Sequence, residues 1–270
     1  MGAGIAQVLL ANGLRVHLID TRPAALEAAR QSIADRFASM HAKGKWAQDP
    51  GLTLERLSIG TLDDAPAFQL MIEAIAEILE VKQALFAAAM AHMPDAIFAT
   101  NTSSLSVNEL AASLVQKDRF VGLHFFNPAP LMPLVEVVQA DTTPDWLVEL
   151  CHALCQTWGK APVIVKDSPG FIVNRVARPF YAESMRTLAD GAASFQAIDH
   201  ALKGQGFKMG PFELMDLIGL DVNYNVTKLV WEGLGKPARF TPNPVQGDRV
   251  ARGDWGIKTH KGFYDYPKDA

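Results

Sequence analysis

The sequence predicts an α/β domain built on a largely parallel sheet, followed by an all-α domain. Two observations predict this order. Up to about residue 166, short apolar runs rich in β-branched or aromatic residues alternate with helical patterns, and from about Asp167 onward only the helical patterns continue. Alternation of this kind is typical of strands joined by crossover helices. We therefore predict two domains, at residues 1–166 and 167–270.

Length and composition limit the class of protein. The chain has 270 residues, of which 49% are hydrophobic and 20% charged, so it holds enough apolar material for two domains with their own cores. Its net charge is -4, and no stretch of the sequence clusters Lys and Arg without interleaved acids. We therefore expect a small-molecule partner and no nucleic acid. No apolar run reaches the roughly 20 residues that span a bilayer, so we expect no membrane partner and a cytoplasmic location.

Six apolar runs in the first domain are predicted strands. Behind the first of them we predict a helix at residues 23–37, because Leu26, Ala29, Ile33 and Phe37 fall at helical spacing and proline, here Pro23, is well tolerated at the first position of a helix. The runs are residues 15–19, 71–76, 96–99, 119–125, 134–138 and 161–165.

The opening residues look like the second half of a dinucleotide-binding fingerprint that runs straight into a helix. Gly2 is then its last glycine, the one that permits close packing of helix on strand. The first strand and the two glycines that shape the pyrophosphate turn would precede Met1. We therefore expect a Rossmann-type domain with its first strand missing, a true start upstream, and poor binding of NAD by the chain as printed.

Asp20 ends the predicted strand 15–19, at about the position where a carboxylate accepts hydrogen bonds from the ribose hydroxyls of a dinucleotide. A carboxylate at this point repels a 2′-phosphate, which favours NAD over NADP. Arg22, two residues later, keeps NADP open. Asp20 could also be an ordinary acid at a strand end.

His124 is the histidine best placed for catalysis. It lies near the carboxyl end of a predicted buried strand, where open α/β sheets bind ligands, and Glu136 lies within the apolar run of the next strand. A carboxylate paired with the imidazole would fix its tautomer and stabilise its charged form. A structural histidine bonded to the backbone and a solvent-facing glutamate on an edge strand are equally compatible with the spacing.

Short polar side chains follow two other apolar segments. Ser103 comes after the predicted strand 96–99, and Ser106 with Glu109 already forms a capping box, which leaves Ser103 available. Asn174 interrupts a core-like helix start after the turn at residues 167–170, and a buried Asn needs several partners. This pattern alone does not distinguish a structural from a functional role for Asn174.

The only two cysteines, Cys151 and Cys155, lie four residues apart in an amphipathic stretch at residues 147–157. This spacing places both on one helix face, without further metal ligands of the right type and spacing. We expect both thiols to pack in a core, and no metal site.

Four motifs occur in one order along the chain: HFFNP at residues 124–128, LVEV at 134–137, PGFIVNR at 169–175 and MGPFE at 209–213. In order and spacing they resemble the 3-hydroxyacyl-CoA dehydrogenase family, and the resemblance extends to KGFYDY at residues 261–266. It implies NAD-dependent oxidation of a 3-hydroxyacyl-CoA to a 3-oxoacyl-CoA. The implied catalytic residues are His124 as the base, Glu136 as its partner, and Ser103 and Asn174 as holders of the substrate oxygen.

The resemblance also implies a cofactor site for NAD. Within it, Glu77 falls at the ligand-facing end of the predicted strand 71–76, whereas Lys82 could instead be a solvated charge on a helix. The implied cofactor residues are Gly2, Asp20, Glu77, Lys82, Asn101, Asn127 and Lys258.

For coenzyme A, the resemblance implies a helical hairpin after the first long helix, at about residues 32–48. Ser32 matches a serine contact of the family, whereas a basic residue one heptad later is replaced by Ser39. Lys43 and Lys45, together with Arg36, are then the candidates for the coenzyme A phosphates.

The second domain shows helical patterns at residues 182–188, 195–202 and 214–229. The resemblance implies that this domain closes over the substrate and makes a homodimer contact. A surplus of aliphatic and aromatic side chains is compatible with such a contact, although burial within one subunit explains it equally well: Phe212, Leu214, Leu217, Ile218 and Leu220.

The stretch at residues 173–183 is similar to bacterial members that oxidise 3-hydroxyadipyl-CoA in phenylacetate breakdown, with Arg178 as the candidate counter-ion for a distal carboxylate. Two alternatives stay open. The first is a binding or structural relative that keeps the fold without turnover, which the incomplete fingerprint favours. The second is a related dehydrogenase acting on free hydroxyacids or sugar acids.

Overall fold

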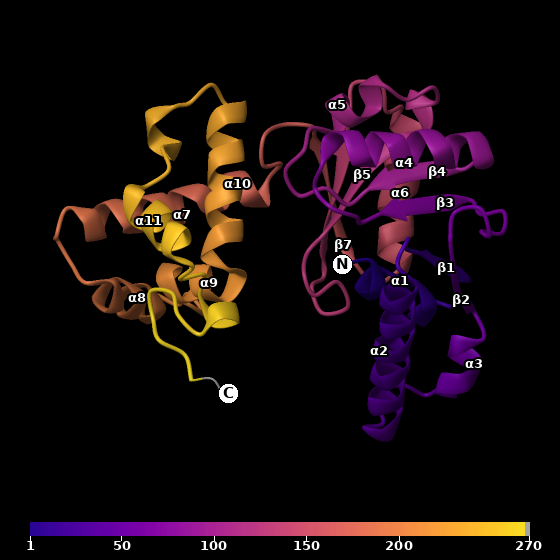
Figure 1. Ribbon diagram of the computed structural model, residues 1–270, viewed down its shortest axis with the longest axis horizontal. Helices are drawn as coiled ribbons and strands as arrows, with labels where there is room; N and C mark the ends of the chain where they lie inside the picture. Colours follow the sequence, from indigo (N-terminus) through magenta and orange to yellow (C-terminus); the bar gives the residue numbers. More distant parts are fainter. Residues whose placement is uncertain (268–270) are drawn as a thin grey trace. The chain divides into compact units, whose positions relative to one another are not determined.

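The computed structural model describes residues 1–267, and the chain divides into two compact units between Asp167 and Ser168. The first unit contains the strands together with six helices of its described residues, and α2 extends well beyond the strands (Figure 1). In chain order its elements are α1 (Gly2–Ala11), β1 (Val16–Ile19), α2 (Pro23–Ala42), α3 (Pro50–Leu54), β2 (Leu57–Gly60), β3 (Leu70–Glu73), α4 (Leu79–His92), β4 (Ile97–Thr100), α5 (Val107–Ala112), β5 (Phe120–Phe125), β6 (Leu134–Gln139), α6 (Asp145–Thr157) and β7 (Ala161–Lys166).

The strands of this unit form two sheets. β1 and β2 pair in parallel, and the other five lie in the order β3-β4-β5-β6-β7. Neighbouring strands are parallel except for β5 and β6, which are antiparallel. The predicted α/β class with a largely parallel sheet is confirmed. The predictions missed β2, because its four residues carry too short a pattern to separate from the preceding helix.

Two predicted boundaries are wrong. β3 ends at Glu73 rather than at residue 76, because the chain turns there and the Ile75 N–H donates to the Glu73 carboxylate at 2.6 Å. The first long helix continues past residue 37 to Ala42, since its exposed face carries no breaker before Gly44.

Apolar faces of α1 and α6 pack on the five-stranded sheet. This core includes Ile5 from α1, Leu123 from β5 and Leu147 from α6. Cys151 and Cys155 belong to it, both 0% exposed, as predicted. Burial raises the pKa of each thiol to about 12, so both stay protonated and unreactive at neutral pH.

The second unit is helical, as predicted. The helix expected at residues 214–229 is two helices, because Gly219 lies between them with φ of +101° and a Cβ there would come within 2.9 Å of Asp221 Oδ1. No helix within residues 1–267 is long and apolar enough to cross a membrane. The helices are α7 (Val173–Ala189), α8 (Phe195–Gly204), α9 (Pro211–Ile218), α10 (Leu220–Gly233) and α11 (Pro244–Arg252).

Two buried aspartates hold the motifs at residues 209–213 and 261–266 in this unit. Asp199 accepts the N–H of Phe212 at the start of α9 at 2.9 Å and the Tyr264 hydroxyl at 2.9 Å. Asp216 accepts the backbone N–H of Phe263 at 3.0 Å. Cβ atoms at Gly210 and Gly262 would fall 2.2 and 2.1 Å from these carboxylates, so close packing against the aspartates explains the glycine in each motif.

Candidate active site

A histidine and a glutamate face each other across the antiparallel pair β5 and β6. His124 and Glu136 are opposite in the register, so both side chains leave the sheet on one face. His124 Nδ1 lies 2.7 Å from Glu136 Oε2, and the residues are 5% and 0% exposed. Because a carboxylate only accepts hydrogen bonds, Nδ1 carries the hydrogen that joins the two side chains. A solvent-facing Glu136 is excluded.

A glycine in β5 allows the close approach of these two strands. Gly122 pairs with Val138, two positions from the His124–Glu136 pair. A Cβ on Gly122 would lie 2.6 Å from the Cβ of Val138, so only glycine fits without a shift of the strands. Gly122 therefore permits the register that aligns the histidine with the glutamate.

Asn101 and Asn127 follow the ends of β4 and β5. Asn101 Oδ1 accepts the Phe125 N–H at 2.8 Å, and the Asn101 N–H donates to the Glu73 carbonyl at 2.8 Å. Asn101 thus joins the ends of three neighbouring strands, whereas Asn127 is exposed. Both residues lie at the carboxyl ends of parallel strands, the edge where open α/β sheets bind ligands.

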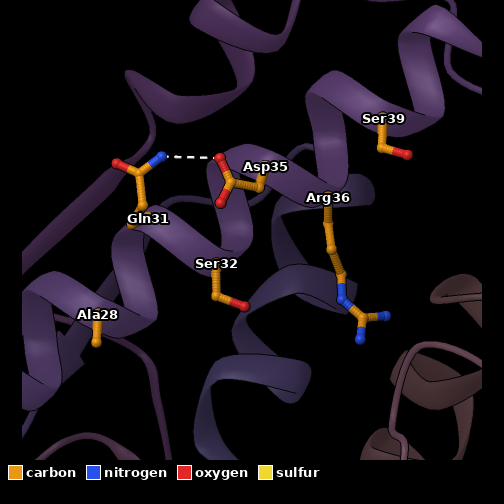
Figure 2. A pocket seen from close by; sticks show the side chains of 6 residues that line it. All are labelled: Ala28, Gln31, Ser32, Asp35, Arg36 and Ser39. Atoms are coloured by element: carbon orange, nitrogen blue, oxygen red, sulfur yellow. Dashed lines mark hydrogen bonds between the residues drawn. The ribbon is translucent and has the colours of Figure 1, made fainter. Parts of the chain in front are cut away.

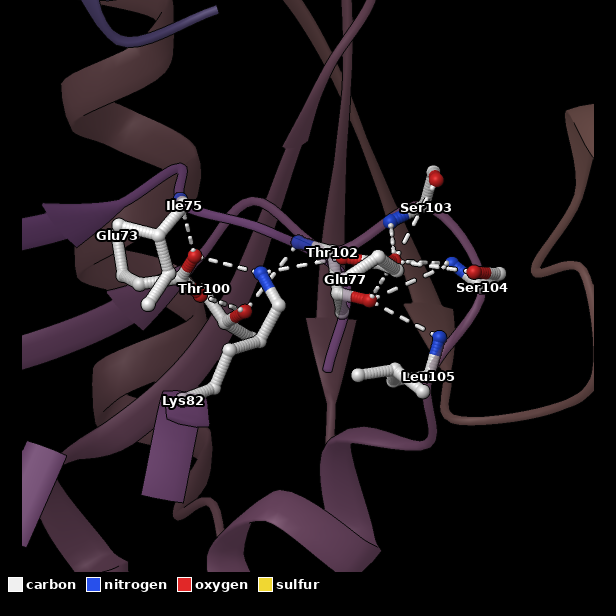
Figure 3. Close-up of polar contacts among 9 residues, drawn as sticks. All are labelled: Glu73, Ile75, Glu77, Lys82, Thr100, Thr102, Ser103, Ser104 and Leu105. Carbon is white, nitrogen blue, oxygen red and sulfur yellow. Dashed lines mark hydrogen bonds and ion pairs between the residues drawn. The ribbon is translucent and has the colours of Figure 1, made fainter. Parts of the chain in front are cut away.

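A polar cluster surrounds Glu77, in the segment between β3 and α4 (Figure 3). Its Oε1 accepts hydrogen bonds from Thr102 Oγ1 at 2.5 Å and from the N–H groups of Ser103 and Ser104 at 2.9 and 3.1 Å. Its Oε2 lies 3.1 Å from Nζ of Lys82. Burial alone would raise the pKa of Glu77, but the Thr102 hydrogen bond and the Lys82 charge outweigh it and lower that pKa.

Lys82 is buried in this cluster. It is 1% exposed, and its Nζ lies 2.5 Å from Oε1 of Glu73. The alternative interpretation of Lys82 as a solvated helix charge is therefore wrong. Its helix position is surface-like in the pattern, but two carboxylates from the β3 end draw the side chain inward.

Ser103 lies next to Glu77 and not in the α5 cap. Ser106 caps α5 by accepting the N–H of Glu109 at 3.2 Å, as predicted. The Ser103 N–H donates to Glu77, and the Ser103 hydroxyl lies 3.5 Å from the same oxygen. Ser103, Glu77 and Lys82 are thus brought together within the first unit.

Asp20 lies just after β1 and is bound by Arg22. The Arg22 N–H donates to its Oδ1 at 2.9 Å, and the guanidinium Nε lies 3.3 Å from the same atom. The side-chain hydrogen bond from Arg22 lowers the pKa of Asp20.

The glycines at the start of α1 differ in how closely they pack. A Cβ at Gly2 would meet Leu18 at 3.9 Å, an ordinary contact, whereas one at Gly4 would meet Ala129 at 3.4 Å, so the tighter packing of α1 is at Gly4.

The coenzyme A candidates divide between a groove and the end of α2. Ser32 lines a shallow groove along α2 together with Arg36 and Ser39 (Figure 2). Lys43 and Lys45 are exposed beyond the end of α2 and do not line this groove. The expected hairpin is a continuous helix to Ala42 followed by a turn and the short α3.

Two candidates belong to the second unit. Asn174 lies in the first turn of α7, and its carbonyl accepts Nε of Arg178 at 2.9 Å. Lys258 is paired with Asp221 of α10 at 2.6 Å, and its Nζ lies 5.1 Å from the centre of the Trp255 ring.

The predictions omitted four residues that the structure places in the Glu77 cluster. One of them carried a usable signal, because Glu73 is an acid within an apolar run, as Glu136 is. The others are hydroxyl side chains whose importance depends on contacts distant in sequence. The four are Glu73, Thr100, Thr102 and Ser104.

The fold and the site together define a class: a nucleotide-binding α/β protein with a helical second unit and a buried, hydrogen-bonded His–Glu pair. Residues 1–168 match the family model described as the NAD binding domain of 3-hydroxyacyl-CoA dehydrogenase, and residues 170–266 match its C-terminal domain. The chain belongs to the 3-hydroxyacyl-CoA dehydrogenase family, and the cofactor of that family domain is NAD.

Named relatives agree with this family. The chain is 46% identical to 3-hydroxyadipyl-CoA dehydrogenase of Escherichia coli K12, covering 98% of this chain but 57% of the relative. It is 42% identical to the mitochondrial hydroxyacyl-coenzyme A dehydrogenase of Sus scrofa, covering 98% and 88%. The crystal structure of (S)-3-hydroxybutyryl-CoA dehydrogenase from Ralstonia eutropha is similar with a TM-score of 0.95 at 36% identity, covering 99% and 96%.

Proposed function

We propose that this chain catalyses the NAD-dependent oxidation of (S)-3-hydroxyacyl-CoA to 3-oxoacyl-CoA. The observation that carries the proposal is the buried pair of His124 and Glu136, at 2.7 Å, within a domain that matches the family's NAD-binding model. The names of the relatives support the substrate class.

In this mechanism the His124 Nε2 takes the proton of the substrate 3-hydroxyl. Bound NAD supplies the acceptor for the hydride that leaves C3. Glu136 stabilises the imidazolium that forms, because its carboxylate already accepts the Nδ1–H. In the reverse direction the same imidazolium returns the proton to the 3-oxo oxygen. We assign Ser103 and Asn174 to holding that oxygen.

The residues of the first unit fit NAD. Asp20 offers a carboxylate with a lowered pKa at the carboxyl end of β1, which matches the ribose hydroxyls of a dinucleotide. The start of α1 has no acidic residue in its first turn, so nothing there repels a pyrophosphate. Asn101, Asn127 and Glu77 follow the carboxyl ends of β4, β5 and β3 in the five-stranded sheet, and we assign them to the cofactor together with Lys258 from the second unit.

We also propose a division of labour in which residues 1–166 bind the cofactor and residues 167–270 hold the substrate and a partner subunit. Ser32, Lys43 and Lys45 are the proposed contacts for coenzyme A. The cytoplasm is the proposed location.

The activity is tested by following NADH absorbance with acetoacetyl-CoA as the substrate. We expect oxidation of NADH that depends on the thioester. Turnover with free 3-oxo acids in its place would support a related hydroxyacid dehydrogenase. No turnover with either, together with bound NADH in a fluorescence titration, would support a binding relative and contradict the enzyme.

Arg178 supports a dicarboxylate as the acyl group. It is 4% exposed, donates to the Asn223 carbonyl at 3.0 Å and to Thr227 Oγ1 at 2.9 Å, and has no acidic partner within residues 1–267. Burial lowers the pKa of this guanidinium to about 10, so it stays charged at neutral pH. It lies one helical turn after Asn174, on the same face of α7. A buried cation without an anion favours a substrate that brings one.

Replacing Arg178 should therefore change specificity. A charge-assisted hydrogen bond contributes about 1.5–3 kcal/mol, so Arg178→Met should lower kcat/KM for 3-hydroxyadipyl-CoA by about 10- to 100-fold. The value for 3-hydroxybutyryl-CoA, measured on the same preparation, should change little and controls for misfolding. Equal losses for both substrates, or no preference for the dicarboxylate in the unchanged chain, would contradict this assignment.

Exposed apolar side chains on α9 and α10 support a homodimer. Leu217, Ile218 and Val222 are 54%, 43% and 45% exposed, so burial within one subunit does not account for them. We expect a dimer by sedimentation velocity and a shift toward monomer in Leu217→Lys. Val115→Lys, at a side chain 94% exposed in the first unit, is the control that should not change the mass.

A further inference from the structure

The buried ion pair behind Glu77 has no role in the chemistry described above. Glu73 ends β3 and Lys82 lies in the first turns of α4, and they are 2% and 1% exposed. Lys82 Nζ and Glu73 Oε1 contact one another at 2.5 Å. Taking two charges out of water is costly unless each has several partners. The burial of the Glu73 and Lys82 charges therefore needs an explanation.

The partners of Glu73 lead to one place. Its Oε2 accepts the hydroxyl of Thr100 at 2.8 Å, and Thr100 Oγ1 in turn accepts the N–H of Thr102 at 3.2 Å. Its Oε1 binds Lys82, whose ammonium reaches Glu77 at 3.1 Å. Two chains of contacts thus start at Glu73 and end at residues 102–104 (Figure 3).

The second chain ends on backbone groups. Glu77 accepts the N–H groups of Ser103 and Ser104, and the Ser104 hydroxyl as well at 3.0 Å. The carboxylate of Glu77 is one-third exposed, so without the buried ammonium only its hydrogen bonds to residues 102–104 would keep it from turning toward water. Lys82 prevents this only while its own position is fixed, and Glu73 is the group that fixes it.

We propose that Glu73 is a positioning residue that acts through Lys82 and Glu77 to hold residues 102–104 in place. The proposal rests on the proposed function in one respect, since Ser103 is the group assigned there to the substrate oxygen. In this role Lys82 orients Glu77 from within the protein.

The test uses the neutral variants Glu73→Gln and Lys82→Met, singly and combined. Because the two residues act in series, each single variant should lower kcat by about tenfold or more, and the double variant should be no worse than the worse single one. KM for NADH and for the thioester should move less than kcat. A pair that only stabilises the fold predicts the opposite, because neutralising both partners removes the buried charges and restores stability and kcat together.

Amide hydrogen exchange gives a readout that does not need turnover. In Glu73→Gln the N–H groups of Ser103 and Ser104 should exchange about tenfold faster than in the unchanged chain, while the N–H of Phe212 keeps its rate. Asp199→Asn is the matched control, a carboxylate 1% exposed in the other unit whose loss should lower stability without changing exchange at Ser104 or kcat per folded molecule.

The proposed function and the positioning role of Glu73 can be refuted independently of each other. If the unchanged chain does not turn over, the proposed function fails, and the exchange rates alone decide the role of Glu73. If the exchange of Ser103 and Ser104 in Glu73→Gln matches that of the unchanged chain, or if the double variant regains full kcat, the positioning role is overturned.

Discussion

His124→Gln should lower kcat by about 10²- to 10⁴-fold, the usual contribution of a positioned general base. Glutamine has similar reach and polarity but no basic nitrogen, so the 3-hydroxyl proton has no acceptor when hydride leaves. KM for the thioester should change little, because the main chain and the other oxygen-holding groups remain. His124 is 5% exposed and fills its site, so the amide should also keep the packing of β5.

The measurement is the steady-state rate of NADH formation and, in reverse, of its consumption. His152→Gln is the matched control, since His152 lies on α6 outside the site and its replacement should leave kcat unchanged. Retention of more than half of kcat in His124→Gln would refute the role of this histidine as the base. Equal loss in both variants would point to misfolding.

Glu136→Gln should be the second-largest defect. The carboxylate accepts the Nδ1–H in the ground state and meets a full positive charge once the proton has moved, and a hydrogen bond to a charged group contributes about 1.5–3 kcal/mol. We therefore expect kcat to fall by about 10- to 100-fold, at about tenfold for each 1.4 kcal/mol. The amide can also donate to Nδ1, which would move the hydrogen to Nε2 and remove the base.

This prediction separates catalysis from folding. Glu136 is 0% exposed, and glutamine removes its charge while preserving its volume, so the midpoint of thermal unfolding should stay within a few degrees. Glu149→Gln, on the exposed face of α6, is the control. Full kcat in Glu136→Gln would show that the carboxylate only fills space. A collapse of stability with unchanged kcat per folded molecule would show that the carboxylate serves the fold and not the chemistry.

The candidate site was predictable where one strong local signal marked it. An acid within an apolar strand must find a partner, and that argument selected Glu136, whereas His124 was selected by its position near the carboxyl end of a buried strand. The same argument applies to Glu73, which stands in an equally apolar run, yet its partner Lys82 lies on a helix position that the pattern assigns to solvent. The turn after β3 decides this, because it brings the start of α4 back over the strand end.

Other parts depended on contacts that no local pattern carries. The antiparallel pairing of β5 and β6 sets His124 opposite Glu136, whereas a parallel sheet throughout would have changed the register. The sequence pattern also did not reveal the break between α9 and α10 at Gly219, because the apolar spacing continues through this glycine.

By itself, the sequence determined the α/β class followed by helices and the family, and it selected His124 and Glu136 as candidates, because strand and helix periodicity and the motif residues are local properties of the chain. Only the tertiary structure decided that Lys82 is buried between two carboxylates, that Glu77 binds residues 102–104, and that Arg178 is buried without an acidic partner within residues 1–267. The physical reason is that burial and hydrogen bonding depend on which distant segments of the chain meet. The identity of a charged residue does not show whether its side chain faces water or a partner.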